Sequence, residues 1–181
     1  MTPRSGEETK KTLEDLLVQL ILGHAGAMET SVQRHQRTEE NFRGTRFGEH
    51  PKDLRGNNDV LVLTRPDVIA EIHRQYLEAG ADIIETNTFS GTAIAQGDYA
   101  LEPLVYELNL EGARLARAAC DEYTAKNPSR PRFVAGSLGP TNRPLSIPPA
   151  VTNPASPTTP SNSPQDTFQA QPPGLRGERG A

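Results

Sequence analysis

The ten residues GADIIETNTF, Gly80 to Phe89, constrain the fold more than any other part of the chain. Gly80 suits the end of a helix because it adopts a positive φ, and residues 81–84 form a short apolar run typical of a buried strand. Polar side chains follow directly, beginning with Glu85 and Thr86. Because polar groups at the carboxyl end of a buried parallel strand usually face a ligand, this segment predicts a ligand-facing strand of an α/β barrel.

Apolar spacing before this segment predicts one short helix and the start of a first strand. The helix is expected over Leu13–Leu20 with Thr12 as its N-cap, and the apolar run continues through residues 21–22 into the strand. Residues 23–58 are polar and show little periodicity, so they predict a long loop at the carboxyl end of that strand. Such loops shape the active sites of barrel enzymes.

A second helix is predicted to begin at Thr64. Thr64 and Asp67 have the spacing of a capping box, and Pro66 has the φ that the first turn of a helix requires. The apolar face of this helix is expected to consist of Val68, Ile72, Tyr76 and Ala79. The predicted strand at residues 81–86 follows it.

The next part of the chain predicts further helices and one more strand. A short polar helix is expected over 92–99 and a long amphipathic helix over 101–125, with Pro103 in its first turn. Residues 131–138 predict the next strand, and 139–142 the turn at its end. The chain therefore has about three strand–helix units. A complete (β/α)8 barrel needs about 250 residues, and this chain has 181.

These patterns predict an α/β fold, namely an incomplete (β/α)8 TIM-type barrel with a disordered Pro-rich C-terminal tail. The expected divisions are a flexible N-terminus at 1–11, a partial barrel domain at 12–144 and the tail at 145–181. Ten of the 16 prolines lie in residues 140–181, where apolar residues nearly disappear, so no packed core is expected there. Because an open barrel has unpaired strand edges and an uncovered apolar interior, we expect marginal stability, self-association through the open edges or dependence on a partner.

Charge and hydropathy argue against two classes of partner. The net charge is −4 and the 19 Lys and Arg residues are scattered along the chain, so we expect no nucleic-acid partner. No apolar run approaches the roughly 20 residues of a membrane span, and the N-terminus carries charges where a signal peptide has its apolar core. We therefore expect a cytoplasmic protein without a membrane partner.

The chain offers no recognisable metal-binding pattern. Cys120 is its only cysteine, and its place beside the apolar stripe of the helix at 101–125 predicts a buried, inert thiol. The four histidines are His24, His35, His50 and His73. Their spacing matches no metal motif, so we expect them on the surface or facing a helix, with His73 bordering solvent. We expect no catalytic and no metal-binding residue in the chain.

Residues Phe42 to Asn142 resemble the homocysteine-binding module of cobalamin-dependent methionine synthase. The matching stretches are FRGTRF (42–47), KDLRGNND (52–59), LTRPDVIAEIHRQYLEAGADIIETNTFSGTAIAQGDY (63–99) and VAGSLGPTN (134–142). The resemblance implies methyl transfer from methylcobalamin to homocysteine bound to zinc as a thiolate, which gives methionine. It also implies three cysteine ligands from later barrel strands. Because this chain lacks them, we expect neither zinc nor methylcobalamin to bind it.

The resemblance further implies a homocysteine-binding turn, D-G-A-M-G-T, after the first strand. The corresponding residues here are AGAMET, 25–30. Ala25 stands in place of the aspartate and cannot accept a hydrogen bond from an ammonium group. Glu29 replaces a glycine that would let the backbone approach a ligand, and its charge would repel a carboxylate. We therefore expect weak or absent homocysteine binding.

The expected substrate-binding residues match the family in this turn and at the later strand ends. They are Gly26, Ala27, Thr30, Thr86, Asn87, Thr88, Gly139 and Asn142. Phe89 and Thr141 are expected to line the same cleft. For Asn87 and Asn142 a simpler alternative stays open, because Asn commonly satisfies exposed loop backbone.

Two functions stay open. Ancestry favours a homocysteine methyltransferase of the methionine synthase type, which fits the residues better than a betaine- or S-methylmethionine-using relative. The missing zinc cysteines favour a catalytically inactive truncated or frame-shifted fragment with no independent enzymatic role. A reading-frame slip just after Pro154 would explain why ASPTTPSNS, 155–163, no longer resembles the family. The adjacent frame of the coding DNA tests that hypothesis.

Overall fold

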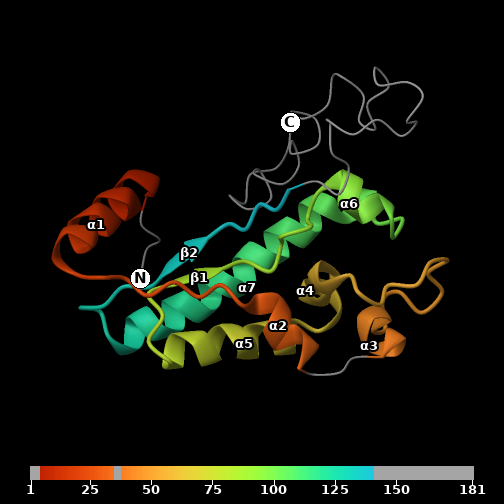
Figure 1. Cartoon of the computed structure of the whole chain (residues 1–181), viewed down its shortest axis with the longest axis horizontal. Helices are drawn as coiled ribbons and strands as arrows, with labels where there is room; N and C mark the ends of the chain where they lie inside the picture. Colours follow the sequence, from red (N-terminus) through yellow and green to blue (C-terminus); the bar gives the residue numbers. More distant parts are fainter. Residues whose placement is uncertain (1–4, 35–37, 141–181) are drawn as a thin grey trace, which may run out of the picture.

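The computed structural model describes residues 5–34 and 38–140, and Figure 1 shows how their elements are arranged. In chain order these are α1 (Gly6–Gln19), α2 (Met28–Gln33), α3 (Glu39–Arg43), the 3-10 helix η1 (Asn58–Val60), α4 (Leu61–Thr64), α5 (Pro66–Glu78), β1 (Ile83–Glu85), α6 (Ala93–Gly97), the 3-10 helix η2 (Glu102–Leu104), α7 (Val105–Lys126) and β2 (Phe133–Ala135). No helix among them has the length and apolarity to cross a bilayer. His35, Thr141, Asn142 and the predicted tail at 145–181 lie outside the described residues.

Strands β1 and β2 form a two-stranded parallel sheet in which Ile84 is level with Val134. On the other side of β1, His24 forms a single parallel bridge with Ile83. The N–H of Ala25 donates to the carbonyl of Ile83 over 2.9 Å. Three chain segments therefore run side by side. Two of them, β1 and β2, are regular strands, and the third pairs through a single bridge.

The predicted first strand is wrong in extent. Residues 21–22 are not part of a strand, and Ile21 is fully exposed at 100%. Pairing begins at Gly23, whose carbonyl accepts the N–H groups of Asp82 and Ile83 over 2.8 and 3.0 Å. An apolar run forms a strand only where a neighbouring strand lies within reach, and here that contact starts later in the chain. The described strands close no barrel, so the TIM-type barrel stays a prediction.

Helices α5 and α7 pack against the sheet (Figure 1). Ile84 is 1% exposed and lies in a cluster with Leu77 of α5 and with Ala116 and Cys120 of α7. Burial of one large aliphatic side chain contributes about 1.5–3 kcal/mol. The small side chains of α7 let the helix approach the strands closely. This layer fixes the position of both strand ends.

Two titratable side chains are buried in this helix layer. Cys120 is fully buried, as predicted; its Sγ–H donates to the carbonyl of Phe133 over 3.4 Å, and burial raises the pKa of the thiol to about 12. The prediction for His73 is wrong, because it is 1% exposed and burial lowers its pKa to about 4. Helix α5 packs against α2 and α4 as well as α7, so its buried face is wider than the predicted stripe. That face includes Leu77, whereas Ala79 is exposed.

The first helix begins earlier than predicted. Ser5 is the N-cap of α1, and its Oγ accepts the N–H of Glu8 over 3.3 Å. The Glu8 carboxylate accepts the N–H of Ser5 over 2.8 Å, which completes a capping box. Thr12 lies inside the helix and donates its hydroxyl to the carbonyl of Glu8 over 2.7 Å. Much of the range 1–11, predicted to be flexible, is therefore helical.

The predicted capping box at Thr64 is also wrong. Thr64 belongs to α4, and its hydroxyl donates to the carbonyl of Val60 over 3.4 Å. Asp67 pairs instead with the guanidinium of Arg65 over 2.7 Å. Helix α5 begins at Pro66, which occupies the first turn as predicted. Because the Thr64 hydroxyl donates to a carbonyl within its own turn, it does not cap α5.

Both helices predicted after β1 are present, but each begins later than predicted. Thr92 caps α6, and its Oγ1 accepts the N–H of Ala95 over 3.2 Å. Pro103 lies in η2, the single 3-10 turn that leads into α7. Helix α7 ends at Lys126, close to the predicted end.

The segment predicted as a long loop contains α2 and α3, and Arg43 orders much of the remainder. Its guanidinium donates to the carbonyls of His50 and Lys52 over 2.7 and 3.0 Å. The carboxylate of Glu39 accepts both the Nε of Arg43, over 2.6 Å, and the N–H of Leu54, over 2.8 Å. Leu54 is fully buried. These hydrogen bonds order the segment and thereby place residues 57–59 at the end of the sheet.

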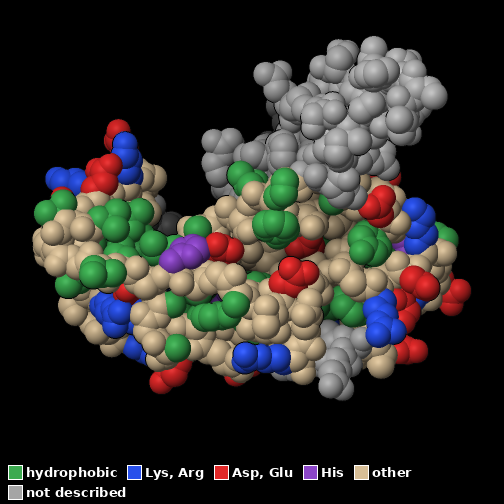
Figure 2. Space-filling view, in the orientation of Figure 1, with side chains coloured by type: hydrophobic (Ala, Val, Ile, Leu, Met, Phe, Trp, Pro, Cys, Tyr) green, Lys and Arg blue, Asp and Glu red, His purple; other side chains and the backbone are tan. Residues whose placement is uncertain are grey.

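Helix α1 contributes nothing to the core. None of its residues is buried. Large apolar side chains on α1 and just after it are exposed, and Figure 2 shows apolar side chains gathered over this part of the molecule. They are Leu17, Val18, Leu20 and Ile21. The core lies instead between α2, α3, α4, α5, α7 and the sheet, with buried side chains of the segment before η1.

Gly112 of α7 lies against the end of β1, so an alanine there should destabilise the fold. A Cβ at Gly112 would lie 2.6 Å from Cγ2 of Thr88. The Thr88 hydroxyl is hydrogen-bonded to Thr86 and Ser137, so this side chain cannot rotate freely. We expect Gly112→Ala to lower the free energy of unfolding by about 1–3 kcal/mol, measured by urea titration. Gly6→Ala is the control, because a Cβ there meets nothing within 4 Å. Equal effects of the two changes would contradict this packing.

Candidate functional site

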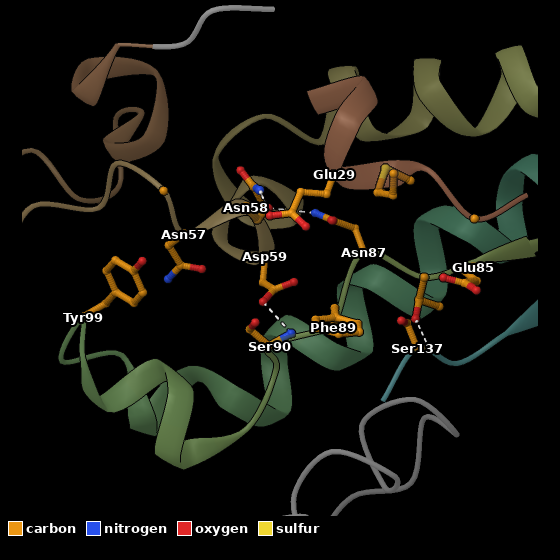
Figure 3. A pocket seen from close by; sticks show the side chains of 14 residues that line it. Glu29, Asn57, Asn58, Asp59, Glu85, Asn87, Phe89, Ser90, Tyr99 and Ser137 are labelled. Atoms are coloured by element: carbon orange, nitrogen blue, oxygen red, sulfur yellow. Dashed lines mark hydrogen bonds between the residues drawn. The ribbon is translucent and has the colours of Figure 1, made fainter. Parts of the chain in front are cut away.

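A cavity of about 410 Å³ opens at the carboxyl ends of β1 and β2 (Figure 3). Its wall comes from the start of α2, from η1 and the residues before it, from the end of β1, from the residues after each strand and from Tyr99 after α6. The lining residues are Gly26, Met28, Glu29, Gly56, Asn57, Asn58, Asp59, Glu85, Thr86, Asn87, Phe89, Ser90, Tyr99 and Ser137. Because parallel strands end at the same edge of a sheet, the polar residues that follow them converge here.

Hydrogen bonds among Thr86, Thr88 and Ser137 connect the end of β1 to the residues after β2. The Oγ1 atoms of Thr86 and Thr88 lie 2.6 Å apart. The N–H of Ser137 donates to Oγ1 of Thr86 over 2.9 Å, and Oγ1 of Thr88 donates to the carbonyl of Ser137 over 3.0 Å. Thr86 and Ser137 line the cavity, whereas Thr88 lies behind them, against Gly112. These bonds set the spacing of the two strand ends.

Asn87 joins the end of β1 to η1. It is 5% exposed, and its Nδ2 donates to the carbonyl of Asn58 over 2.8 Å. The Nδ2 of Asn58 donates in turn to Oε1 of Glu29 over 3.4 Å, and Figure 3 shows the three side chains close together. Asn87 therefore does satisfy a loop carbonyl, but from a buried position in the cavity wall. This series of amides brings β1, η1 and α2 around one space.

A buried amide pair fixes the opposite wall. The Nδ2 of Asn57 donates to Oε1 of Gln96 over 2.8 Å, and the Nε2 of Gln96 donates back to Oδ1 of Asn57 over 3.3 Å. The same Oδ1 accepts the N–H of Val60 over 3.3 Å and caps η1. The pair holds α6 against η1, which places Tyr99 in the wall.

Asp59 is a buried carboxyl group in this wall. It is 5% exposed, and its Oδ2 accepts the N–H of Ser90 over 2.9 Å. Burial raises the pKa of Asp59 to about 7; the Ser90 hydrogen bond opposes the rise and the charge of Glu29 adds to it. Asp59 is therefore partly protonated at neutral pH. It can accept a hydrogen bond from a ligand or donate one.

Acidic groups dominate the charge of the wall. Glu29, Asp59 and Glu85 line it, and the described lining includes no Lys or Arg. The Nε2 of His24, outside the lining, lies 3.3 Å from Oε1 of Glu85, and both side chains are partly exposed. Such a wall favours a ligand with hydrogen-bond donors or a positive charge.

The described residues do not fit the zinc site that the family resemblance implies. They hold no group of three or more His, Cys, Asp or Glu side chains that could bind a metal ion. The only cysteine of the chain, Cys120, donates to backbone in the helix layer and does not line the cavity. A catalytic zinc needs about three protein ligands. Among the described residues, the groups that line the cavity offer hydrogen bonds and charge.

The structure brings some of the predicted binding residues into the cavity. Gly26, Thr86 and Asn87 line it, and so does Phe89. Gly26 comes from the turn that the sequence identified, and the others from the end of β1. The two predicted regions therefore do meet at one site.

The remaining predicted residues lie elsewhere. Ala27 is the N-cap position of α2, and Thr30 is exposed on that helix, outside the lining. Thr88 and Gly139 lie outside the lining; a Cβ at Gly139 would clash with the carbonyl oxygen of Phe89, which explains why glycine stands there. Asn142 lies outside the described residues.

Eight lining residues, most of them around η1, were not predicted as site residues from the sequence. The missed residues are Met28, Gly56, Asn57, Asn58, Asp59, Ser90, Tyr99 and Ser137. A signal for four of them was present in GNND, 56–59, a dense polar run in a stretch that matches the family. The pattern of this run predicts a loop, because its helical turn is too short to show periodicity.

Comparison with known proteins identifies relatives of this chain. A sequence model described as homocysteine S-methyltransferase matches residues 24–174. The homocysteine methyltransferase MmuM from Escherichia coli, in its metallated form, is similar over 91% of this chain and 53% of that chain, with 21% identity and a TM-score of 0.65. Its oxidized form is similar over 91% and 52%, with 22% identity and a TM-score of 0.64. The chain thus spans about half the length of these structures and shares that part of their fold.

Ionisation of Asp59 should destabilise the folded chain as pH rises. The unfolded carboxyl releases its proton near its ordinary pKa of 3.8, whereas the folded one keeps it until about pH 7. Stability should therefore fall between these values, by up to roughly 4 kcal/mol. Asp59→Asn should remove most of this loss, measured by urea unfolding from about pH 4 to about pH 8.

Asp121→Asn is the matched control for this experiment. Asp121 is exposed on α7 and pairs with Arg117 on the surface. It should keep the pH dependence of the unaltered chain. If the free energy of unfolding depends on pH in the same way for Asp59→Asn and for the unaltered chain, Asp59 is ionised at neutral pH.

Proposed function

The chain belongs to the homocysteine S-methyltransferase family, and from this premise we propose that its cavity binds the amino-acid end of homocysteine, the methyl acceptor. The observation that carries the proposal is the convergence of buried polar side chains on one cavity at the carboxyl ends of β1 and β2. Ligands of α/β barrels bind at this edge. A volume of about 410 Å³ suits a small amino acid.

The wall supports an orientation with the ammonium group against its acidic side. An ammonium group has three hydrogen-bond donors and no acceptor. Asp59 and Glu29 offer carboxyl oxygens to such a group. Asn87 offers its side-chain amide oxygen, while its amide nitrogen already donates to the Asn58 carbonyl. Holding this end of the molecule limits where the sulfur can lie. Such positioning is a large part of what an enzyme contributes to a transfer between two bound groups.

Within the family we propose a relationship to cobalamin-dependent methionine synthase. The support is the series of matching stretches between Phe42 and Asn142. In that class methylcobalamin supplies the methyl group. The acceptor must react as a thiolate, because a free thiol with a pKa of about 8.5 is mostly protonated at neutral pH.

The missing metal ligands favour a second candidate, a binding module without turnover. The thiol of Cys120 has a pKa of about 12 and lies outside the cavity lining, so it cannot act as a thiolate ligand there. No group of the described residues provides the donor set that would ionise the substrate sulfur on a metal. We therefore expect weak homocysteine binding and no methyl transfer by the isolated chain.

Titration calorimetry of the purified chain with L-homocysteine tests the proposed binding. Asn87→Ala should weaken binding about tenfold or more, because it removes a wall amide and leaves the Asn58 carbonyl without its partner. Tyr99→Phe removes a single hydroxyl from the wall and keeps the ring, so it should fold normally and weaken binding less.

Asn127→Ala is the control for these two variants. Asn127 is exposed at the end of α7 and does not line the cavity, so this variant should leave the Kd unchanged. Circular dichroism should show that each variant is folded. A folded chain that gives no heat with homocysteine would refute the proposal.

Zinc content separates the two candidates. We expect metal analysis of the purified chain to find far less than one zinc ion per molecule. Incubation with homocysteine and methylcobalamin should then give no methionine. One zinc ion per chain together with methionine formation would instead favour the enzyme over the binding module.

A further inference from the structure

The paired part of the sheet has two outer edges. Strand β2 forms one of them and the segment 23–25, ahead of α2, forms the other, with β1 between the two (Figure 1). Along a strand of a parallel sheet, the backbone groups of successive residues face alternate neighbours. The residues that do not bond to β1 therefore turn their N–H and C=O groups to the outside.

On the β2 edge these residues are Val134 and Gly136. The N–H of Phe133 donates to the carbonyl of Asp82 over 2.8 Å, so Phe133 faces β1. Val134 comes next and therefore faces away from β1, and so does Gly136, which is exposed. Among residues 5–34 and 38–140, no further strand lies beside β2.

The 23–25 edge is centred on His24. The carbonyl of Gly23 accepts the N–H of Ile83 over 3.0 Å, and the N–H of Ala25 donates to the carbonyl of Ile83 over 2.9 Å. His24 lies between them, is exposed, and turns its own N–H and C=O away from β1. Neither 23–25 nor 133–136 contains Lys or Pro, the residue types that commonly prevent an edge from pairing. Both edges can therefore accept a parallel strand.

The two faces of the sheet are covered unequally. Ile84 is buried against α5 and α7, whereas Ile83 and Glu85 point to the other face because side chains alternate along a strand. Ile83 and Glu85 are only partly buried, and the Nε2 of His24 lies 3.3 Å from the Glu85 carboxylate on the same face. Parallel sheets normally have both faces covered. A partner that pairs with the two edges would cover this face as well.

We propose that this partner is a second copy of the chain, and that two copies close one continuous parallel sheet. A two-fold axis parallel to the strands keeps every strand parallel and places the 23–25 edge of each copy against the β2 edge of the other, which makes two equal junctions. No strand edge then stays open. Size is consistent with this assembly, because the chain spans 53% and 52% of two related structures. Two copies together have about the length of one such relative.

Sedimentation equilibrium of the full chain tests the proposal. Over an about hundredfold range of concentration, we expect an equilibrium between one chain and two chains, with no larger species. A single chain at every concentration would overturn the proposal. Species that keep growing with concentration would overturn it as well, because they would show that the edges pair one at a time and do not close.

Hydrogen exchange locates the contact without any substitution. In the dimer, the backbone amides of His24, Val134 and Gly136 should exchange at least about tenfold more slowly than in the single chain, because each gains a hydrogen bond or is covered by one. A dimer that leaves all three amides unprotected forms through another surface, and the proposal is then wrong.

Proline at either edge provides a second test, because it removes the outward N–H group. In a symmetric dimer each substitution alters both junctions, so Val134→Pro and His24→Pro should each weaken dimerisation at least about tenfold. Gly6→Pro is the matched control. Gly6 is the first residue of α1, a position that accepts proline, and it belongs to neither edge. This variant should keep the Kd of the unaltered dimer.

An equimolar mixture of the two edge variants should restore dimers. When one chain of each kind pairs, one junction has two altered edges and the other has two unaltered edges. We expect the mixture to dimerise at least about tenfold more tightly than either variant alone. If both variants are folded by circular dichroism and the mixture is no better than its components, the two-fold arrangement is wrong. If a variant does not fold, hydrogen exchange of the unaltered chain decides.

Discussion

The parallel pairing of β1 with β2 is the interaction on which the rest of the structure depends. Each strand has three residues, and a two-stranded sheet is marginal alone in water. The helix layer supplies the missing stability, because Ile84 is buried with Leu77 of α5 and the small residues of α7. In return, the pairing places both carboxyl ends at one edge, where Thr86, Thr88 and Ser137 connect them. The cavity exists because these ends are held together.

The cavity concentrates polar groups in a partly dehydrated space, and each is stabilised in a different way. Asn57 and Gln96 satisfy one another, while Asn87 satisfies a backbone carbonyl. Asp59 has one backbone donor, and burial shifts the balance toward its neutral form. The burial that makes Asp59 costly when ionised also makes it responsive to a cation. The groups that reduce the stability of the fold are therefore those most able to recognise a ligand.

Local sequence signals predicted structure correctly where no neighbour competes for the same side chain. Thr92 caps α6 and Pro103 begins the turn into α7, as their patterns indicate. Thr64 has an equally good capping pattern, but its hydroxyl bonds within α4. Thr12 lies inside a helix that Ser5 had already started. A capping pattern shows only that a residue is able to cap a helix. Whether it does so depends on the hydrogen bonds that the neighbouring turns make with it.

The sequence by itself determined the buried strand within Gly80–Phe89, the helices on either side of it and membership of the family. It also placed polar residues after the strand, because those follow directly along the chain. Only the tertiary structure decided which of them face the cavity, since Thr86 lines it and Thr88 packs against α7. Asn58 and Asp59 reach Asn87 and Ser90 from about 30 residues away. Such contacts depend on how the helices and loops pack, and no local pattern of side chains encodes that packing.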